Sequence, residues 1–396
     1  MSRPTSDVHP DDVQPFEARA TDAELDDLRA RLAAARLPER ETVDPAARGA
    51  RRWDQGVPLA DLVDLVDHWR TAYDWRRFEE RLARIGQFRT TIDGLGLHFL
   101  HRRSPRADAV PLVMTHGWPG SVAEFVDVVD ELADPPLPDA PAFHVVAPSL
   151  PGFAYSDRPS TTGWGTERIA AAWVQLMGRL GYGQFLAHGG DWGGNVTTVL
   201  AGRFPEHVLG IHTTFADAPP HLPTDGLTET ERRWAAQTRD FYAGPRGAYA
   251  KQQAARPQTI GYALVDSPVA LLAWILDKFA EWSDTDDSPF ETLSRDRVLD
   301  DVTLYWLTRT GASAARIYHE SHAAMDPELR VDVPAAITMY PRDIEKCPRP
   351  WAQERYRRIV RWHEPERGGH FPSLEVPDLY VADLRAGLAR VLAAAG

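Results

Sequence analysis

The sequence is poor in cysteine, in basic residues and in long apolar runs, and each shortage excludes a class of protein. Cys347 is the single cysteine in 396 residues, so the chain forms no internal disulfide, which suits a reducing cytoplasm. The net charge of −13 argues against nucleic acid and against anionic membrane surfaces as partners. No apolar stretch approaches the roughly 18 residues of a membrane-spanning helix, and the first twenty residues are polar and acidic, without a signal-peptide core. We therefore expect a cytoplasmic protein that binds neither nucleic acid nor a membrane.

The apolar residues that are present change their spacing near Phe88. Before it they follow a helical period: Leu25, Leu28 and Leu32 come after a capping-box pattern at Thr21–Glu24. From Phe88 to Arg102 they alternate around a glycine turn, which indicates a hairpin. Short apolar runs then alternate with helical stretches at 122–132 and 167–180; the runs cover 110–114, 143–147, 184–187 and 209–213. Strands and helices in alternation predict a mostly parallel sheet that is covered on both faces.

A long helical segment interrupts this alternation. After Pro219 the strand signals stop, and the chain stays helical and rich in aromatic residues to about Met325. Strand signals return at 336–340 and 359–363, and an amphipathic helix ends the chain. The sequence thus predicts four parts: an N-terminal helical region at 1–88, α/β core at 89–218, a helical cap at 219–325, and the rest of the core at 326–396.

Asp191 is the most informative residue, because it lies where many hydrolases carry a nucleophilic serine. The string HGGDWGG, His188 to Gly194, follows an apolar run and precedes a segment that can form a helix. Its Gly-x-Asp-x-Gly pattern has the form of a nucleophile elbow, a sharp turn at which small flanking residues let the backbone pass closely. A carboxylate in that position can form an ester with a carbon electrophile.

Three other strings fit an elbow of this kind. HGWPGS, His116 to Ser121, follows a predicted strand, and the backbone N–H of Trp118 is expected to form an oxyanion hole with that of Trp192. His370 lies in a glycine-flanked loop after the last predicted strand, and Asp343 follows the strand before it. The resulting chain order, Asp191, Asp343 and His370, is the order of nucleophile, acid and histidine in an α/β-hydrolase fold.

Taken together, the motifs resemble those of the microsomal-type epoxide hydrolases of the α/β-hydrolase fold. The strings that carry the resemblance are HGWPGS, PSLPGFAYS (148–156), GGDWGG, ERGGHFP and the segment 255–284. The resemblance runs from about Val13 to the C-terminal helix, and its N-terminal part is similar to a family region that wraps across core and cap. The membrane anchor of the animal enzymes has no counterpart in the matching segments, and the resemblance therefore points to a soluble, bacterial-style member.

The resemblance also implies roles for individual residues. Asp191 would be the nucleophile, His370 the base and Asp343 the acid, while Tyr249 and Tyr318 of the cap would donate hydrogen bonds to the epoxide oxygen. Tyr242, Tyr262 and Tyr305 stay open as alternatives for the tyrosine pair. The expected reaction joins an epoxide and water to a vicinal diol through an aspartyl ester, and it needs no metal or organic cofactor.

The substrate and two rival functions stay open on the sequence alone. Aromatic residues of the cap favour an apolar or aryl epoxide if they line the pocket, and say nothing if they only pack the cap; they are Trp234, Phe241, Trp274, Phe279 and Trp282. A haloalkane dehalogenase shares the aspartate nucleophile, and a non-catalytic binding protein shares the fold. A serine esterase is disfavoured by Asp191. A homodimer is compatible with the sequence.

Overall fold

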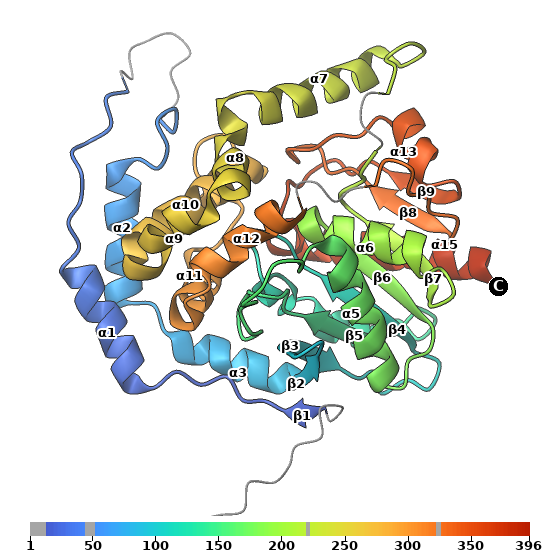
Figure 1. The fold of residues 1–396 in the computed structure, drawn as a ribbon, viewed down its shortest axis with the longest axis horizontal. Helices are drawn as coiled ribbons and strands as arrows, with labels where there is room; N and C mark the ends of the chain where they lie inside the picture. Colours follow the sequence, from blue (N-terminus) through green and yellow to red (C-terminus); the bar gives the residue numbers. More distant parts are fainter. Residues whose placement is uncertain (1–12, 44–51, 219–221, 322–325) are drawn as a thin grey trace, which may run out of the picture.

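The computed structural model describes residues 13–43, 52–218, 222–321 and 326–396, and one nine-stranded sheet runs through this part of the chain (Figure 1). The strand order is β1-β2-β3-β5-β4-β6-β7-β8-β9. The strands are β1 (Gln14–Pro15), β2 (Gln87–Ile92), β3 (Leu95–Arg102), β4 (Val110–Thr115), β5 (Phe143–Pro148), β6 (Phe185–Gly189), β7 (Val208–Thr213), β8 (Ala335–Thr338) and β9 (Ile359–His363). β1, β2 and β3 pair antiparallel, as does β3 with β5, and the pairs from β5 through β9 are parallel.

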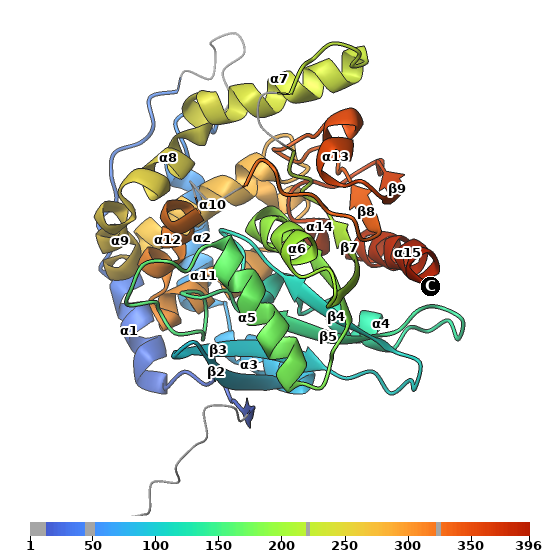
Figure 2. The ribbon, with the colours of Figure 1, turned by 45° about the vertical axis from the view of Figure 1, so that its right-hand side comes forward.

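The parallel strands are apolar on both faces, because helices cover both. In β4, Val113 joins one hydrophobic cluster, whereas Leu112 and Met114 on the opposite face join the other. The first cluster includes side chains of α5 (Thr166–Arg179) and α6 (Asp191–Arg203), and the second those of α15 (Pro377–Ala395). Figure 2 shows α5 and α6 in front of the strands, with α15 beside β7 and β8. This arrangement confirms the predicted sheet and its two helical layers.

One predicted helix was wrong. The segment expected to be helical over 122–132 forms a short 3-10 turn, η1 (Val122–Phe125), and a short helix, α4 (Val129–Ala133). Asp127 lies between the two pieces and is drawn outward by Arg81 and Arg297, which come from distant parts of the chain. These ion pairs are tertiary contacts, so the local apolar spacing could not reveal the break.

The N-terminal helices lie against the helical insert. They are α1 (Asp22–Ala33), α2 (Leu59–Thr71) and α3 (Trp75–Ile85), and the capping box predicted at Thr21 is present. The insert comprises α7 (Glu229–Ala243), η2 (Pro245–Gly247), α8 (Ala248–Ala255), α9 (Pro257–Asp266), α10 (Pro268–Trp282), η3 (Pro289–Glu291), α11 (Arg295–Thr308) and α12 (Gly311–Ser321). Trp69 of α2 donates its indole N–H to Thr303 of α11 at 2.9 Å, and the Tyr73 hydroxyl bonds Asp300 at 2.8 Å. Figure 1 shows these blue and yellow-orange helices side by side.

Short helices complete the end of the chain: α13 (Arg349–Arg355) follows β8, and α14 (Pro372–Glu375) precedes α15. None of the helices in the described ranges is long and apolar enough on its own to cross a bilayer. The expected limits of the cap, at 219 and 325, and the first twelve residues lie outside the described residues.

Candidate active site

Asp191 lies in a strained turn between β6 and α6. It is the first residue of α6, and its backbone φ of 49° is in the left-handed region that L-residues other than glycine rarely adopt. The flanking glycines make the turn possible, because a Cβ at position 189 would overlap the carbonyl of Gly193, and a Cβ at position 193 would overlap the carbonyl of Thr115. This packing explains the Gly-x-Asp-x-Gly pattern and presents the carboxylate at the carboxyl end of the parallel strands.

The turn after β4 holds one oxygen of that carboxylate. The backbone N–H of Trp118 donates to Asp191 Oδ1 at 2.9 Å. Gly117 lets the two segments approach, since a Cβ there would overlap the Asp191 side chain. Trp192 lies in the first turn of α6, where backbone N–H groups have no partner within the helix. Two backbone donors expected from the sequence therefore lie on the two segments that meet at Asp191.

His370 bridges Asp191 and Asp343. The His370 Nδ1 atom lies 2.7 Å from Asp343 Oδ1, and Nε2 lies 3.4 Å from Asp191 Oδ2. Asp343 comes from the loop after β8 and His370 from the loop after β9, and both side chains are buried. The backbone N–H of His370 donates to the carbonyl of Trp282 at 2.9 Å, so the end of α10 holds the loop that carries His370 in place. The three residues chosen from the sequence thus form one connected chain of contacts.

The charges around His370 decide its protonation. Burial lowers the pKa of the imidazole, but the carboxylates of Asp343 and Asp191 more than offset it, and the pKa lies well above its usual range. A raised pKa means that the imidazolium form is favoured while both carboxylates are charged. With Nδ1 bonded to Asp343, the Nε2 atom is the one that faces the Asp191 carboxylate.

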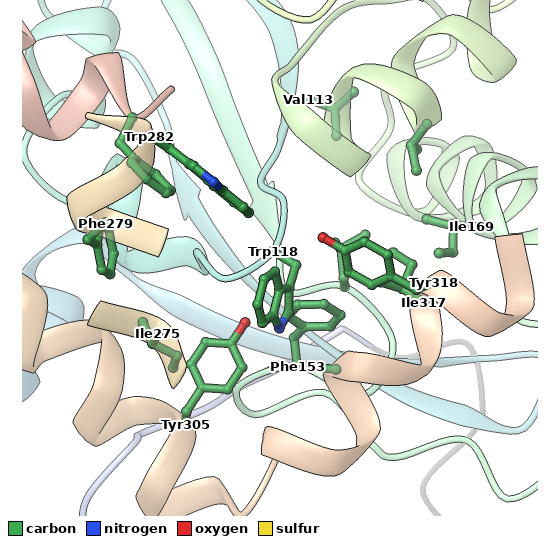
Figure 3. Packing of buried hydrophobic residues seen from close by; sticks show 14 of the residues in the cluster. Val113, Trp118, Phe153, Ile169, Ile275, Phe279, Trp282, Tyr305, Ile317 and Tyr318 are labelled. Atoms are coloured by element: carbon green, nitrogen blue, oxygen red, sulfur yellow. The ribbon is translucent and has the colours of Figure 1, made fainter. Parts of the chain in front are cut away.

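Tyr249 and Tyr318 line a cavity of about 360 Å³ that borders Asp191. Tyr249 belongs to α8 and Tyr318 to α12, and their ring centroids lie 5.8 Å apart. Figure 3 shows Tyr318 beside Trp118, and the Trp118 ring also stacks on that of Tyr249 at 5.4 Å. Burial raises the pKa of both phenols well above the usual value, and the charge of Asp191 raises both further. Both tyrosines are therefore neutral hydrogen-bond donors at neutral pH.

The alternative tyrosines are placed differently. Tyr262 is 70% exposed on α9, away from this cavity's lining. The Tyr305 hydroxyl donates to the carbonyl of Gly120 at 2.9 Å and so supports the turn after β4. Tyr242 does line the cavity, but its hydroxyl donates to Glu345 Oε2 at 3.0 Å. Of the three, Tyr242 alone shares the cavity with the expected pair, and its proton is already engaged.

The five aromatic residues of the cap that suggested an aryl substrate do not line the cavity. Its aromatic walls, among the described residues, are Trp192, Phe215 and the tyrosines 242, 249 and 318. Trp282 packs instead against His370, with ring centroids 5.0 Å apart, and Phe279 packs against Phe371 at 4.5 Å. Figure 3 shows Phe279 and Trp282 on the α10 side of Trp118. The sequence could not distinguish these roles, because an aromatic residue that lines the cavity and one that packs in the core have the same apolar signal in the sequence.

Two partly buried glutamates near the site were not found from the sequence. Burial raises the pKa of Glu345 to about 8, with the nearby Asp217 adding to the effect, and Glu345 lines the large cavity. Burial likewise raises the pKa of Glu124 to about 8. The signal for Glu124 was its position three residues after Ser121, but Ser-x-x-Glu is also the ordinary pattern of a helix cap. In the structure Ser121 caps the 3-10 turn at Ala123 and bonds Asp301, so Glu124 is left to face the site.

Fold and site together define an α/β-hydrolase with an aspartate at the elbow. Comparisons with known proteins narrow this class. Residues 13–125 match the family model described as the epoxide hydrolase N terminus, and residues 110–256 match the model of the alpha/beta hydrolase fold. The chain is 47% identical over 377 residues to a protein of Stigmatella aurantiaca assigned to the epoxide hydrolases, covering 94% of this chain and 84% of that protein.

Two further comparisons are with a protein of Sus scrofa and with a solved structure from Aspergillus niger. Epoxide hydrolase 1 of Sus scrofa is 33% identical over 416 residues, which cover 97% of this chain and 90% of that protein. The structure of Aspergillus niger epoxide hydrolase superposes with a TM-score of 0.85 at 33% identity and covers 96% of this chain and 97% of that one. This chain belongs to the epoxide hydrolase family.

Proposed function

We propose that this chain converts an apolar or aryl epoxide and water into a vicinal diol through an ester of Asp191. The observation that carries the proposal is the position of the Asp191 carboxylate. It borders a cavity with two neutral phenols in its wall and lies 3.4 Å from an imidazole whose other nitrogen is bonded to a second carboxylate. A nucleophile, proton donors and a base are thus all within one shell of contacts.

In the first step, Asp191 Oδ2 attacks an epoxide carbon from the side opposite the ring oxygen. A carbon–oxygen bond to Asp191 forms, the epoxide carbon–oxygen bond breaks, and its electron pair stays on the epoxide oxygen. Tyr249 and Tyr318 donate hydrogen bonds to that oxygen, which would otherwise leave as a poorly stabilised alkoxide. The need for such donors favours an epoxide over a haloalkane, because a departing halide needs no proton.

In the second step, His370 takes a proton from water, and the resulting hydroxide adds to the Asp191 ester carbonyl. The backbone N–H groups of Trp118 and Trp192 stabilise the tetrahedral oxyanion, and Asp343 stabilises the imidazolium. Collapse of the intermediate breaks the ester bond, and the departing diol oxygen takes the proton from the His370 imidazolium. The epoxide oxygen takes its proton from one of the tyrosines, and the proton left on the Asp191 carboxyl group after collapse restores that phenol. The Asp191 carboxylate that remains then contains one oxygen atom from the solvent. Neither step requires a metal or an organic cofactor.

The shape of the cavity supports a flat or apolar substrate body. At about 360 Å³ it has room for an aryl epoxide, and Trp192, Phe215 and Tyr242 present aromatic surface beside Asp191. Polar side chains, Asp217, Lys251 and Glu345, also reach this cavity. A substrate panel that pairs each aryl epoxide with its hydroxylated analogue tests whether the cavity prefers an apolar or a polar substrate. Chiral analysis of the diols measures the products.

Our first prediction tests the covalent step. In His370→Gln the ester should form but not hydrolyse, because the nucleophile and the phenols are retained while the base is lost. Intact-protein mass spectrometry after incubation with an aryl epoxide should show an added substrate mass, mapped to a peptide that contains Asp191. Asp191→Asn is the matched control and should show no adduct.

The wild-type protein supplies the companion measurements. It should release diol from the aryl epoxide and no halide from a bromoalkane of similar size. Diol release by the wild type without any adduct in His370→Gln would contradict the ester mechanism, and halide release would make the chain a dehalogenase.

A further inference from the structure

Asp191 separates two cavities of very different size. The larger one, of about 360 Å³, contains the phenols of Tyr249 and Tyr318 in its wall. The smaller one, of about 20 Å³, lies on the other side of Asp191 and is lined by His370 and Glu124. Asp191 is the one residue that the two linings share. The base of the second step therefore faces the small cavity rather than the space proposed for the substrate.

The small cavity has room for about one water molecule, since a water needs roughly 10–15 Å³ of such space. Most polar groups in its wall already have partners. Both ring nitrogens of His116 contact backbone groups, and the Tyr380 hydroxyl lies 2.6 Å from His188 Nε2. Among the groups in this wall, the Nε2 atom of His370 and the carboxyl group of Glu124 can hold a water beside Asp191.

We propose that Glu124 is a positioning residue which, together with His370, holds the hydrolytic water on the face of Asp191 opposite the substrate. The inference rests on the proposed ester mechanism and adds a residue to it. The epoxide would reach Asp191 from the large cavity, and the water that cleaves the ester would attack from the small one. Access from two sides lets the water stay in place while the substrate binds and reacts.

The turn after β4 places Glu124 for this role. Glu124 lies in η1, and the nearby backbone N–H of Gly117 opposes part of the rise in the pKa of its carboxyl group. Gly120 leaves the space that the carboxyl group occupies, because a Cβ at position 120 would overlap Glu124 Oε1. Tyr305 of α11 fixes the same turn through its bond to the Gly120 carbonyl. The segment that supplies the oxyanion donor at Trp118 therefore also carries the water-binding group.

Glu124 is suited to bind water without competing as a base. Burial, with the charge of Asp301 next, raises the pKa of Glu124 to about 8, so the group is mostly neutral at pH 7. A neutral carboxyl group can accept a hydrogen bond from the water through its carbonyl oxygen. The water then gives its other proton to His370 Nε2 as its oxygen adds to Asp191 Cγ. Glu124 keeps its own proton throughout, so glutamine should replace it well.

The test separates the two chemical steps in Glu124→Ala. Stopped-flow tryptophan fluorescence and quenched-flow mass spectrometry with an aryl epoxide measure ester formation and ester hydrolysis. We expect hydrolysis to slow by roughly 10- to 100-fold, as for a lost positioning contact, while ester formation changes little. Because the ester then accumulates, kcat and KM should fall together and kcat/KM should stay near the wild-type value. Glu124→Gln should retain most of the hydrolysis rate.

Two further variants keep the result interpretable. Gly120→Ala retains the glutamate but displaces its carboxyl group, and it should reproduce the defect of Glu124→Ala. Asp300→Asn is the matched control, since Asp300 is a buried carboxyl group of α11 that bonds Tyr73 and is absent from the lining of the small cavity; its hydrolysis rate should be unchanged.

Three outcomes would overturn the inference: wild-type ester hydrolysis in Glu124→Ala, an equal fall of kcat/KM and kcat in that variant, or a Glu124→Gln variant as slow as Glu124→Ala. Failure of the proposed function is distinguishable from all three, because the wild-type protein would then form neither ester nor diol.

Discussion

The carboxylates of Asp343 and Asp191 together raise the basicity of His370. In the free protein two carboxylates, Asp191 and Asp343, raise the pKa of the imidazole against the opposing effect of burial. Formation of an ester would neutralise Asp191 and leave Asp343 as the remaining charge. The pKa of His370 should then fall, and the imidazole would lose its proton as the ester forms. The base thus becomes available at the step that needs it.

The second prediction follows from this coupling. Hydrolysis requires neutral His370, so its rate should rise with pH as the imidazole loses its proton. Asp343→Asn removes the charge that raises the pKa, and the rising limb should therefore move to lower pH. The rate at the plateau should also fall, by up to about 10⁴-fold, because the imidazole loses its orienting partner. Single-turnover hydrolysis of the preformed ester across pH 5–9 measures both effects, and an unmoved limb would refute the coupling.

The third prediction concerns the two phenols. Tyr249→Phe or Tyr318→Phe should slow ester formation by roughly ten- to a thousandfold, because each removes a hydrogen bond that strengthens as charge develops on the epoxide oxygen. The affinity for the substrate should fall by a smaller factor than the rate of ester formation. The double variant should be nearly inactive toward epoxides. Rapid-quench measurement of ester formation gives the rates.

Tyr262→Phe is the control for this series, since Tyr262 is an exposed tyrosine of the same helical insert. It should behave as the wild type. A Tyr249/Tyr318 double variant that opens epoxides at close to the wild-type rate would remove both residues from the mechanism.

The packing of helices against loops decides where His370, the proposed base, lies. The end of α10 meets the loop after β9 at Trp282, which bonds the His370 backbone and packs edge-on against its ring. Trp282 is fully buried, and its ring also contacts those of Trp118 and Phe371. One helix of the insert thereby supports both the base and the turn that carries the oxyanion donor.

The fourth prediction tests this support. Trp282→Ala should reduce the free energy of unfolding by about 3–5 kcal/mol, the usual range for deleting a buried large aromatic side chain. It should also slow ester hydrolysis more than ester formation, because His370 loses its packing while the phenols stay in place. Urea unfolding and the same single-turnover assays measure the two effects. Trp274→Ala on the same helix, at a partly exposed position, is the control and should spare the hydrolysis rate.

Across the protein, several carboxyl groups are buried where burial raises their pKa. The pKa values are about 8 for Glu124, Asp301 and Glu345 and about 7 for Asp300 and Glu375. These groups hold protons in the folded protein at a pH at which the unfolded chain has lost them. Stability therefore falls as the pH rises from the unfolded pKa, 3.8 for aspartate and 4.5 for glutamate, to the folded value, by about 1.4 kcal/mol per pH unit for each such group.

Three buried histidines with lowered pKa values act in the opposite direction, but over a lower pH range. Burial lowers the pKa of His98 to about 3 and that of His101 and His116 to about 4. The unfolded chain binds these protons below about pH 6.5, so this contribution to stability grows as the pH rises from 4 to 6.5 and is constant above that. Between pH 6.5 and 8 the carboxyl groups decide the trend.

The fifth prediction is that the free energy of unfolding falls between pH 6.5 and 8. Urea unfolding at fixed ionic strength measures it. Asp301→Asn should reduce the slope of the free energy of unfolding against pH by the equivalent of about one proton. Asp301 Oδ1 accepts a hydrogen bond from Ser121 at 2.6 Å, whereas Oδ2, among the described atoms, is buried without a partner, as suits a protonated group. A flat or rising profile in the wild-type protein would contradict this account.

Most of the strands and the nucleophile turn could be predicted from the sequence because their causes are local. An apolar run of about five residues between helical stretches can be buried on both faces only as an inner strand, and glycines at 189 and 193 permit the sharp turn at Asp191. The break at Asp127 could not be predicted, because its cause is a pair of arginines more than forty residues away along the chain. The position of Glu124 beside Asp191, which depends on Gly120 and on α11, was hidden for the same reason.

The amino-acid sequence determines the identity and order of the three proposed catalytic residues, since Asp191, Asp343 and His370 each follow a strand that ends at the same edge of the sheet. Tertiary structure decides which groups share a space. It places the tyrosines of α8 and α12 over Asp191, turns Trp282 toward His370 instead of the large cavity, and leaves a water-sized space beside Glu124. The physical reason is that covalent spacing controls local conformation, whereas a cavity exists only where several distant segments fail to fill the volume between them.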